Sequence, residues 1–366
     1  MGDKIASKKI AADAGVSTIP GFKGIIATTE DAVRISREIG YPVMMKASAG
    51  GGGKGMRVAH DDDEVREGFE VSKREALNSF NDDRMLVEKY IVDGHHIEIQ
   101  VMADGHGNVA AFPERECSVQ RRNQKVVEES PSVLLDAATR RAMQEQAMML
   151  SRAVDYRSAG TVEMIVDNDL GFYFLEMNTR LQVEHPVSEC ITGVDLVREM
   201  LNVAAGLPLS PELVDAPHVP FRGHAIETRI YAEDPLRNFL PSTGPLVTYR
   251  EPTSATVDGN APPALAATGS AAGSAAAAEP CAPVRVDAGV DEGSTISMFY
   301  DPLISKLITY GETRESALFR MGLALDSYVI KGVGHNVPFL RDVCRNHNFA
   351  AGKYSTSFIP NEYPEG

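Results

Sequence analysis

The chain has 366 residues, of which 36 are Lys or Arg and 51 are Asp or Glu, so its formal charge is −15 at pH 7. This length leaves room for two or three domains with substantial cores. The acidic balance argues against non-specific nucleic-acid binding, which needs a cationic face. No apolar run approaches the roughly 18 residues that a membrane helix needs. The four cysteines are widely spaced, which excludes a zinc ribbon or a disulfide scaffold and favours a reducing compartment.

The first 205 residues alternate predicted helices and strands, a pattern typical of an α/β or α+β fold. We expect helices at 4–14, from Thr28 to Ile39, after Asp61, at 135–154 and at 194–205. We expect strands at 41–47, 56–59, 84–91, 98–103, 109–112, 161–167 and 172–177.

The pattern changes after Pro208, where strands are expected at 224–233 and 296–300 and a helix at 313–330. Residues 253–283 are rich in Ala, Gly, Ser and Pro and nearly uncharged. Such a segment buries too little apolar surface to order itself, so we predict a disordered insertion there.

A glycine-rich loop joins two predicted strands at 49–55. Glycines allow successive N–H groups to converge on phosphate oxygens, and a loop between two strands is typical of a lid over phosphates. Lys46 ends the apolar strand before the loop, and a buried lysine needs an anionic partner. The alternative for the loop is a flexible surface hairpin. The alternative for Lys46 is a side chain whose ammonium group reaches solvent.

The hairpin over residues 161–177 carries the most specific prediction. If the strands pair in register with Asp167 opposite Phe172, Glu163 faces Glu176 directly. Opposed carboxylates destabilise a sheet unless a cation lies between them, and Asn178 follows on the same face as Glu176. Carboxylate and amide oxygens are ligands that Mg²⁺ or Mn²⁺ prefers. The alternative is a solvated polar face.

Two further polar stretches extend this group of candidates. Arg180 offers a planar fork to a small oxyanion, and Glu184 is a candidate general base. The alternative interpretation is that Glu184 and His185 form an ion pair with a purely structural role. The polar run at 120–129 is either a solvated loop or a site in which Lys125 contacts a transferred phosphoryl group.

Several of these stretches resemble the biotin carboxylases of the ATP-grasp type, namely 46–56, 88–90, 120–129 and 176–186. Within that family, the α subunits of propionyl-CoA carboxylase are most similar at 17–22, 41–56 and 299–306, followed by those of methylcrotonyl-CoA carboxylase. The resemblance implies an ATP-grasp domain at 1–206, with a lid subdomain at about 47–92, and a biotin carboxylase C-terminal domain at 207–366 that contains the insertion 253–283.

The resemblance also implies the site residues. It implies ATP contacts at Lys4, Lys46, Gly51, Gly52, Gly53, Glu88, Lys89, Ile91, His96, Gln120 and Asn123, the last replacing a histidine of some members. It implies metal ligands at Glu163, Glu176 and Asn178, and a bicarbonate site at Arg180, Gln182 and Val183. Glu184 then acts as the base, Lys125 neutralises the transferred phosphoryl group, and Arg285 stabilises the biotin enolate.

The activity implied is the ATP-dependent carboxylation of biotin by bicarbonate through carboxyphosphate, with ATP, Mg²⁺ or Mn²⁺, bicarbonate and biotin as its small molecules. The family's N-terminal domain and biotin-attachment motif have no counterpart in the sequence. We therefore expect a biotin carrier domain in trans, a carboxyltransferase β subunit and a second copy of the chain as partners, and neither nucleic acid nor membrane.

Two alternatives stay open, a catalytically impaired fragment or non-catalytic subunit, and another ATP-grasp ligase such as a purine carboxylase. The expected compartment is the mitochondrial matrix for a eukaryotic source and the cytoplasm otherwise.

Overall fold

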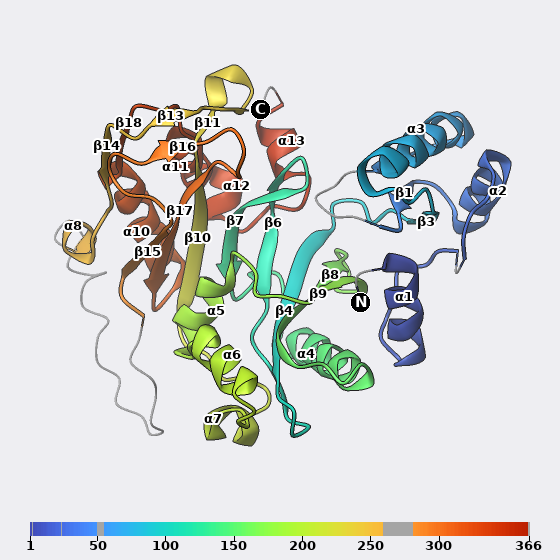
Figure 1. The fold of residues 1–366 in the computed structure, drawn as a ribbon, viewed down its shortest axis with the longest axis horizontal. Coiled ribbons are helices and arrows are strands. Elements are labelled where there is room, and N and C mark those ends of the chain that lie inside the picture. Colours follow the sequence, from blue (N-terminus) through green and yellow to red (C-terminus); the bar gives the residue numbers. More distant parts are fainter. Residues whose placement is uncertain (2, 23, 50–54, 259–280, 365–366) are drawn as a thin grey trace.

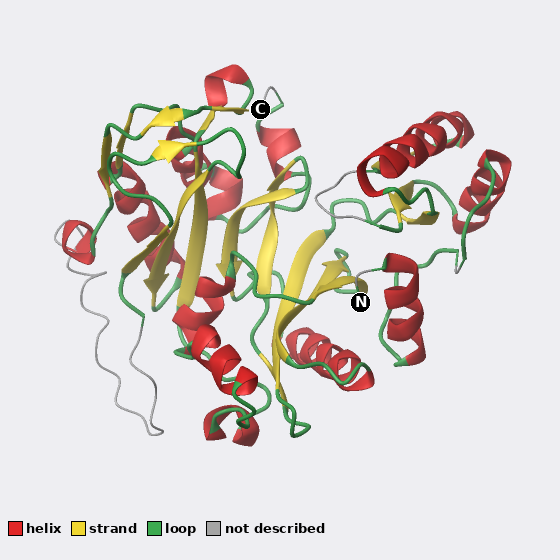
Figure 2. Ribbon diagram, viewed as in Figure 1, coloured by secondary structure: helices red, strands yellow, loops and turns green. Residues whose placement is uncertain are grey.

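The structure is a computed structural model that describes residues 1, 3–22, 24–49, 55–258 and 281–364. A small antiparallel sheet with two helices forms an N-terminal lobe, and a larger sheet with helices on both sides forms the body (Figures 1 and 2). The predicted mixture of helix and sheet is confirmed.

The large sheet runs through both halves of the chain. Its antiparallel strands are, in spatial order, β15 (Val284–Ala288), β17 (Leu303–Gly311), β10 (His224–Tyr231), β7 (Gln124–Ser130), β6 (Arg115–Arg121), β4 (His95–Ala103), β8 (Ser158–Val166) and β9 (Phe172–Asn178), and β5 (Val109–Ala111) pairs with β4. Because β7 pairs with β10, the sheet is continuous across the predicted domain boundary at 206/207.

The N-terminal lobe places its own sheet beside this body. Its strands lie in the order β2 (Met56–Ala59), β1 (Val43–Ala47) and β3 (Met85–Lys89), packed against α2 (Thr29–Ile39) and α3 (Asp62–Phe80). Helix α1 (Lys4–Asp13) packs instead against β9 and α4 (Ala137–Ala153), so it joins the lobe to the body.

Side-chain caps hold the starts of two of the predicted helices. The Thr28 hydroxyl accepts a hydrogen bond from Asp31 N at 3.1 Å, and Asp136 accepts one from Thr139 N at 2.7 Å. Such caps satisfy backbone donors that a helix leaves unpaired in its first turn.

The alternation of residues along β4 separates a core face from a polar face. Ile97, Ile99 and Val101 pack in the core beneath α4, whereas Glu98 and Gln100 point to the opposite face and are nonetheless fully buried. Buried carboxylates need partners, so this polar face is where a site is expected.

The remaining helices and strands complete the body. The helices are α5 (His185–Thr192), α6 (Leu196–Ala204), α7 (Pro211–Asp215), η1 (Pro235–Arg237), α8 (Ser254–Asp258), α10 (Arg314–Ser327), α11 (Val337–Arg345), α12 (His347–Ala350) and α13 (Phe358–Glu362). The short strands are β11 (Glu233–Asp234), β12 (Leu240–Pro241), β13 (Gly244–Pro245), β14 (Thr248–Arg250), β16 (Thr295–Ile296) and β18 (Val329–Lys331). No described helix has both the length and the apolar character needed to cross a bilayer.

The predicted disordered insertion is wrong at its edges. Helix α8 lies inside it, and Val257 is fully buried in the C-terminal core because its side chain packs beside β15 and α10. Residues 259–280 lie outside the described part of the chain. The strand predicted at 296–300 ends at Ile296, and residues 298–300 form an exposed turn.

Two cysteines are joined by a disulfide that their spacing did not predict. Cys190 on α5 and Cys281 before β15 have Cα atoms 4.7 Å apart, whereas Cys117 and Cys344 are free and buried.

Candidate functional site

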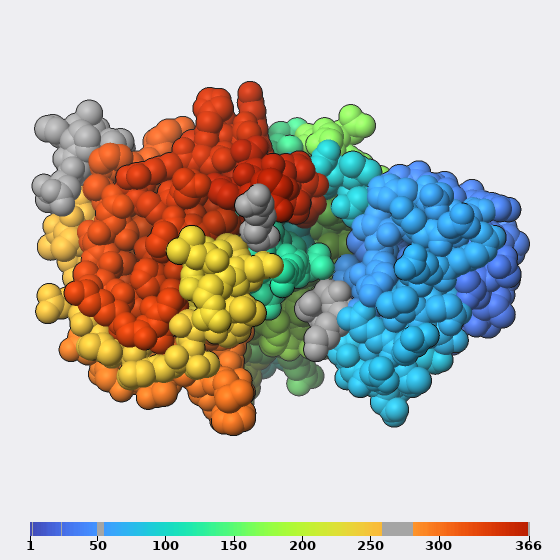
Figure 3. All heavy atoms as spheres, turned by 90° about the horizontal axis from the view of Figure 1, so that it is seen from above, coloured from blue at the N-terminus to red at the C-terminus, as the bar shows by residue number. Residues whose placement is uncertain are grey.

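A cavity of about 400 Å³ is lined by residues of both the N-terminal lobe and the body. In the view from above, the surface is hollowed between the lobe and the rest of the molecule (Figure 3). Many of the predicted site residues line this cavity, namely Lys4, Lys46, His96, Gln120, Asn123, Lys125, Glu163, Glu176, Asn178, Arg180, Gln182, Val183 and Glu184.

A row of carboxylates crosses the floor of the site. Glu98 on β4 is opposite Glu163 on β8, and Glu163 is opposite Glu176 on β9. The predicted pairing of the last two residues is therefore confirmed, whereas Glu98 was missed. The sequence does carry a signal for Glu98, since this charged residue lies between two apolar residues, Ile97 and Ile99.

Lys125 gathers three carboxylates around one ammonium group. Its Nζ donates to Glu98 Oε2 at 2.6 Å, to Glu163 Oε1 at 2.9 Å and to Glu184 Oε1 at 2.6 Å. Burial lowers the pKa of Lys125, but the three carboxylates outweigh burial and hold that pKa well above its ordinary value. The lysine therefore stays charged and is held at the floor of the cavity.

Glu184 lies between two cations. Its Oε2 accepts a hydrogen bond from Arg229 Nη2 at 2.9 Å, and Glu128 in turn accepts one from Arg229 Nε at 2.6 Å. Burial raises the pKa of Glu184, but the neighbouring charges, first Lys125 and then Arg229, lower it below its ordinary value. The carboxylate is ionised, as a proton acceptor must be.

Helix α1 and strand β1 contribute lysines to the opposite wall. Lys4 Nζ lies 3.8 Å from Glu176 Oε2, and Lys46 Nζ lies 3.1 Å from Glu88 Oε2. Lys8, one turn after Lys4 on α1, also pairs with Glu88. Burial lowers the pKa of Lys46 to about 8. A wall of clustered lysines suits a polyanion.

A second cavity of about 490 Å³ adjoins the first through Lys46, His96, Gln120 and Asn123, which line both. It is also lined by the predicted residues Lys89 and Ile91, and by Thr356 and Pro360 near α13, which the sequence did not indicate. The Lys89 ammonium group donates to the carbonyls of Gly40 and Tyr41.

The structure places Arg285 away from both cavities. This residue lies on β15 outside both cavities, where it pairs with Glu189 and Asp287 at 2.7 and 2.8 Å. Arg229 on β10 lies in the first cavity instead. The low-complexity segment before Arg285 gave no register for placing it.

Two other expectations have different outcomes. Glu88 lies beside the cavities without lining them, because its carboxylate is turned toward Lys8 and Lys46. Gly51, Gly52 and Gly53 lie outside the described residues, so the lid stays a prediction.

The donor set at the carboxylate row suits a divalent cation. Glu163 and Glu176 are directly opposed, and Asn178 follows two residues along β9, opposite Thr161. Like charges in this arrangement repel each other unless a cation separates them, and oxygen donors suit Mg²⁺.

Comparison with known proteins supports the resemblance to biotin carboxylases in both halves of the chain. Residues 3–212 match the family model described as the ATP-binding domain of the carbamoyl-phosphate synthase L chain, and residues 265–361 match the biotin carboxylase C-terminal domain. The chain belongs to the biotin carboxylase family. Its ATP-grasp fold followed by a biotin carboxylase C-terminal domain is thereby established.

Solved biotin carboxylases share this fold. One is the biotin carboxylase domain of the Hydrogenobacter thermophilus 2-oxoglutarate carboxylase, which was crystallised as a dimer with MgADP, ADP and bicarbonate. It is 41% identical to this chain, with a TM-score of 0.88, and the match covers all of this chain and 74% of that one. A biotin carboxylase from Campylobacter jejuni is 39% identical with a TM-score of 0.87 over 99% of this chain and 74% of that one.

Curated relatives include α chains of propionyl-CoA carboxylase. That of Ruegeria pomeroyi is 58% identical over 100% of this chain and 52% of its own length, and the human mitochondrial one is 57% identical over 100% and 46%. The chain thus spans about half the length of these relatives.

Proposed function

We propose that the chain catalyses the ATP-dependent carboxylation of biotin by bicarbonate, as the first half-reaction of an acyl-CoA carboxylase. The observation that carries this proposal is the row of opposed carboxylates, Glu98, Glu163 and Glu176. Lys125 donates to the first two, and the lysines of α1 and β1 line the other side of the cavity. A triphosphate with its divalent ion satisfies both walls at once, because it brings anions to the lysines and cations to the carboxylates.

Binding roles follow from position. Lys4, Lys8 and Lys46 would contact phosphate oxygens, and the adjoining cavity is large enough for the nucleoside. Glu163, Glu176 and Asn178 would hold Mg²⁺ or Mn²⁺. The ion would neutralise the charge of the phosphates during phosphoryl transfer.

The proton acceptor is Glu184. While Lys125 and Arg229 both donate to this carboxylate, its basicity is low. If Lys125 turns to a phosphoryl oxygen, Glu184 loses one cation and its pKa rises, so it becomes a better base for bicarbonate. Bicarbonate would lie against Arg180, Gln182 and the backbone of Val183.

Arg229 takes the role that the resemblance had given to Arg285. Its guanidinium lines the cavity beside Glu184, where a planar cation can stabilise the oxyanion of a biotin enolate. Carboxyphosphate would yield CO₂ and phosphate, and the phosphate would remove the proton from biotin N1.

The acceptor and the partners follow from the relatives. We propose propionyl-CoA as the final acceptor because several relatives are propionyl-CoA carboxylase α chains. The partners would be a biotin carrier domain, a carboxyltransferase β subunit and a second copy of the chain, since one structural relative is a dimer. The compartment would be the mitochondrial matrix in a eukaryote and the cytoplasm in a bacterium.

The decisive experiment measures ADP formed by the purified chain with Mg·ATP, bicarbonate and free biotin. Glu163→Gln removes one charge from the carboxylate row and should lower biotin-dependent turnover by roughly a hundredfold. Asp169→Asn, an exposed change at the turn of the same hairpin, is the matched control and should leave turnover unchanged.

Equal turnover in Glu163→Gln and the unchanged chain would contradict the proposal. A chain that binds Mg·ATP in calorimetry yet forms no ADP would instead be the non-catalytic subunit considered above.

A further inference from the structure

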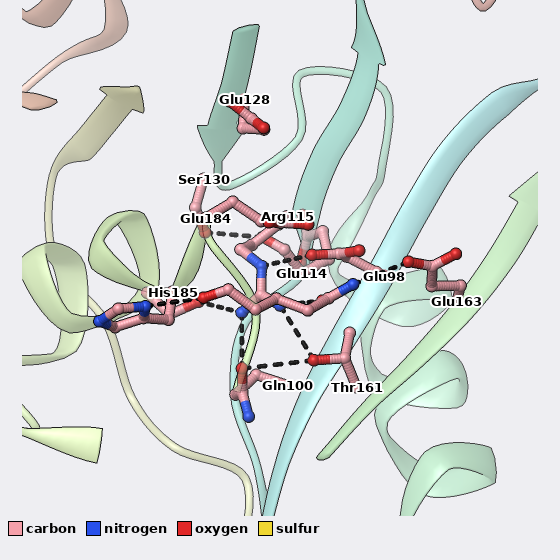
Figure 4. A network of polar contacts seen from close by, with 12 residues as sticks. Glu98, Gln100, Glu114, Arg115, Glu128, Ser130, Thr161, Glu163, Glu184 and His185 are labelled. Carbon is pink, nitrogen blue, oxygen red and sulfur yellow. Dashed lines mark hydrogen bonds and ion pairs between the residues drawn. The ribbon is translucent and has the colours of Figure 1, made fainter. Parts of the chain in front are cut away.

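Arg115 on β6 is one of the largest fully buried side chains among the described residues, and it does not line the cavity. Its guanidinium makes five hydrogen bonds, to Glu98 Oε1 at 2.5 Å, Gln100 Oε1 at 2.9 Å, Ser188 Oγ at 3.0 Å, Thr161 Oγ1 at 3.1 Å and Gln182 Oε1 at 2.8 Å. Figure 4 shows Arg115 among Glu98, Gln100 and Thr161.

Two of these partners act directly on the site. Glu98 holds the ammonium group of Lys125, and Gln182 uses its own amide to donate to Glu163 Oε1 at 2.8 Å. Because Arg115 accepts nothing, its bond to the Gln182 oxygen fixes that amide with its NH₂ group toward Glu163.

A third partner connects Arg115 to the segment that carries the proposed base. Ser188 lies on α5, whose first residue directly follows Glu184. One side chain thus contacts β4, β8, α5 and the loop before α5. Only a guanidinium has enough donors in one rigid plane to do so, since lysine has a single nitrogen.

Two partly buried arginines of the chain differ from Arg115 in their partners. Arg314 donates twice to Glu129 and to the carbonyls of Phe349 and Ala350, and none of these residues lines the first cavity. Arg140 likewise pairs with Glu114 outside it. A role in stability alone therefore does not require the partners that Arg115 has.

We propose that Arg115 is a positioning residue of the biotin carboxylation reaction, which sets Gln182 for bicarbonate and, through Glu98, sets Lys125 for the phosphoryl group without touching either. This inference rests on the proposed function. It implies that loss of the Arg115 guanidinium weakens the bicarbonate step far more than it weakens nucleotide binding. Arg115 does not line the second cavity, where the nucleoside would bind.

The test compares Arg115→Lys with Arg314→Lys, which removes an equally forked but remote guanidinium. For Arg115→Lys we expect kcat/KM for bicarbonate to fall by about 10- to 100-fold, with the KM for ATP changed by no more than about threefold. For Arg314→Lys we expect a lower Tm and unchanged kinetic constants. Wild-type bicarbonate kinetics in Arg115→Lys, or the same kinetic loss in Arg314→Lys, would overturn the inference.

A second variant covers the case in which Arg115→Lys does not fold. Thr161→Val removes one acceptor of the guanidinium and leaves every charge in place, and it should raise the KM for bicarbonate by a few-fold. An unchanged KM would contradict the positioning role.

Crystal structures separate this inference from the proposed function, because they need no turnover. In Arg115→Lys, Gln182 should no longer lie within hydrogen-bond distance of Glu163. In Thr161→Val, used if the first variant does not fold, the Arg115 guanidinium should shift and its contact with Gln182 should lengthen. An unchanged contact would overturn the inference even if the unmodified chain proved inactive, and inactivity of that chain alone would reject only the proposed function.

Discussion

Lys8 shows how a buried charge identifies a site residue that a local sequence pattern hides. It lies one turn after Lys4 on α1, in a stretch that reads as an ordinary amphipathic helix. Burial and the charge of Lys46 lower the pKa of Lys8 well below its ordinary value. Two lysines share the single carboxylate of Glu88, so an anion in the cavity would relieve their repulsion.

Removing this charge should weaken nucleotide binding. Lys8→Met is expected to raise the Kd for Mg·ATP about tenfold, because one charge-assisted contact to a phosphate is lost. Isothermal titration calorimetry gives the Kd directly. Lys9→Met is the control, since Lys9 is exposed on the same helix. An equal or tighter Kd in Lys8→Met would show that Lys8 serves only as a counter-ion of Glu88.

Residues of the site that the sequence did not reveal share one property. Glu98, Arg115 and Arg229 are charged residues on strands of the large sheet. Their chemistry depends on partners many residues away, such as the 67 residues between Arg115 and Gln182. Local periodicity can flag such residues as unusual, but it cannot name the partners that give them a role.

At the scale of single elements, the β8–β9 hairpin was predicted correctly only in part. Glu163 does face Glu176, but Val166 rather than Asp167 pairs with Phe172. A register shift between Glu163 and Met164 restores the predicted pairing farther along. The alternation of side chains specifies which face is buried, whereas a bulge depends on local backbone geometry that composition does not encode.

Helix α8 provides a stability prediction at the same scale. Val257→Ala should lower the free energy of unfolding by about 2 kcal/mol, because it removes buried methyl groups from the C-terminal core. Urea denaturation measures this change. Ala255→Ser, an exposed position on the same helix, should have little effect. Equal stability of Val257→Ala and the unmodified chain would show that α8 does not pack as described.

At the scale of the whole molecule, a buried ionic cluster joins the two halves of the chain. Glu129 on β7 accepts hydrogen bonds from Arg314 at 2.7 and 3.0 Å, faces His224 Nε2 at 2.5 Å, and also accepts a hydrogen bond from Tyr354. The partners come from β10, α10 and the segment after α12. The resemblance implied two domains in sequence, yet the sequence could not show that one sheet and one ionic cluster span both.

This cluster should make the protein sensitive to acid. Burial raises the pKa of Glu129, but His224 and Arg314 outweigh burial and hold that pKa at about 2. A carboxylate whose pKa is lower when folded stabilises the protein above the unfolded value, near 4.5, and this contribution is lost as pH falls from there toward 2. The full contribution is about 3 kcal/mol.

Chemical denaturation between pH 5 and 3 should show a smaller loss of stability in Glu129→Gln than in the unmodified chain. Glu145→Gln, which removes an exposed carboxylate, should retain the steeper dependence. Parallel pH profiles for the unmodified chain and Glu129→Gln would show that the cluster does not set the acid response.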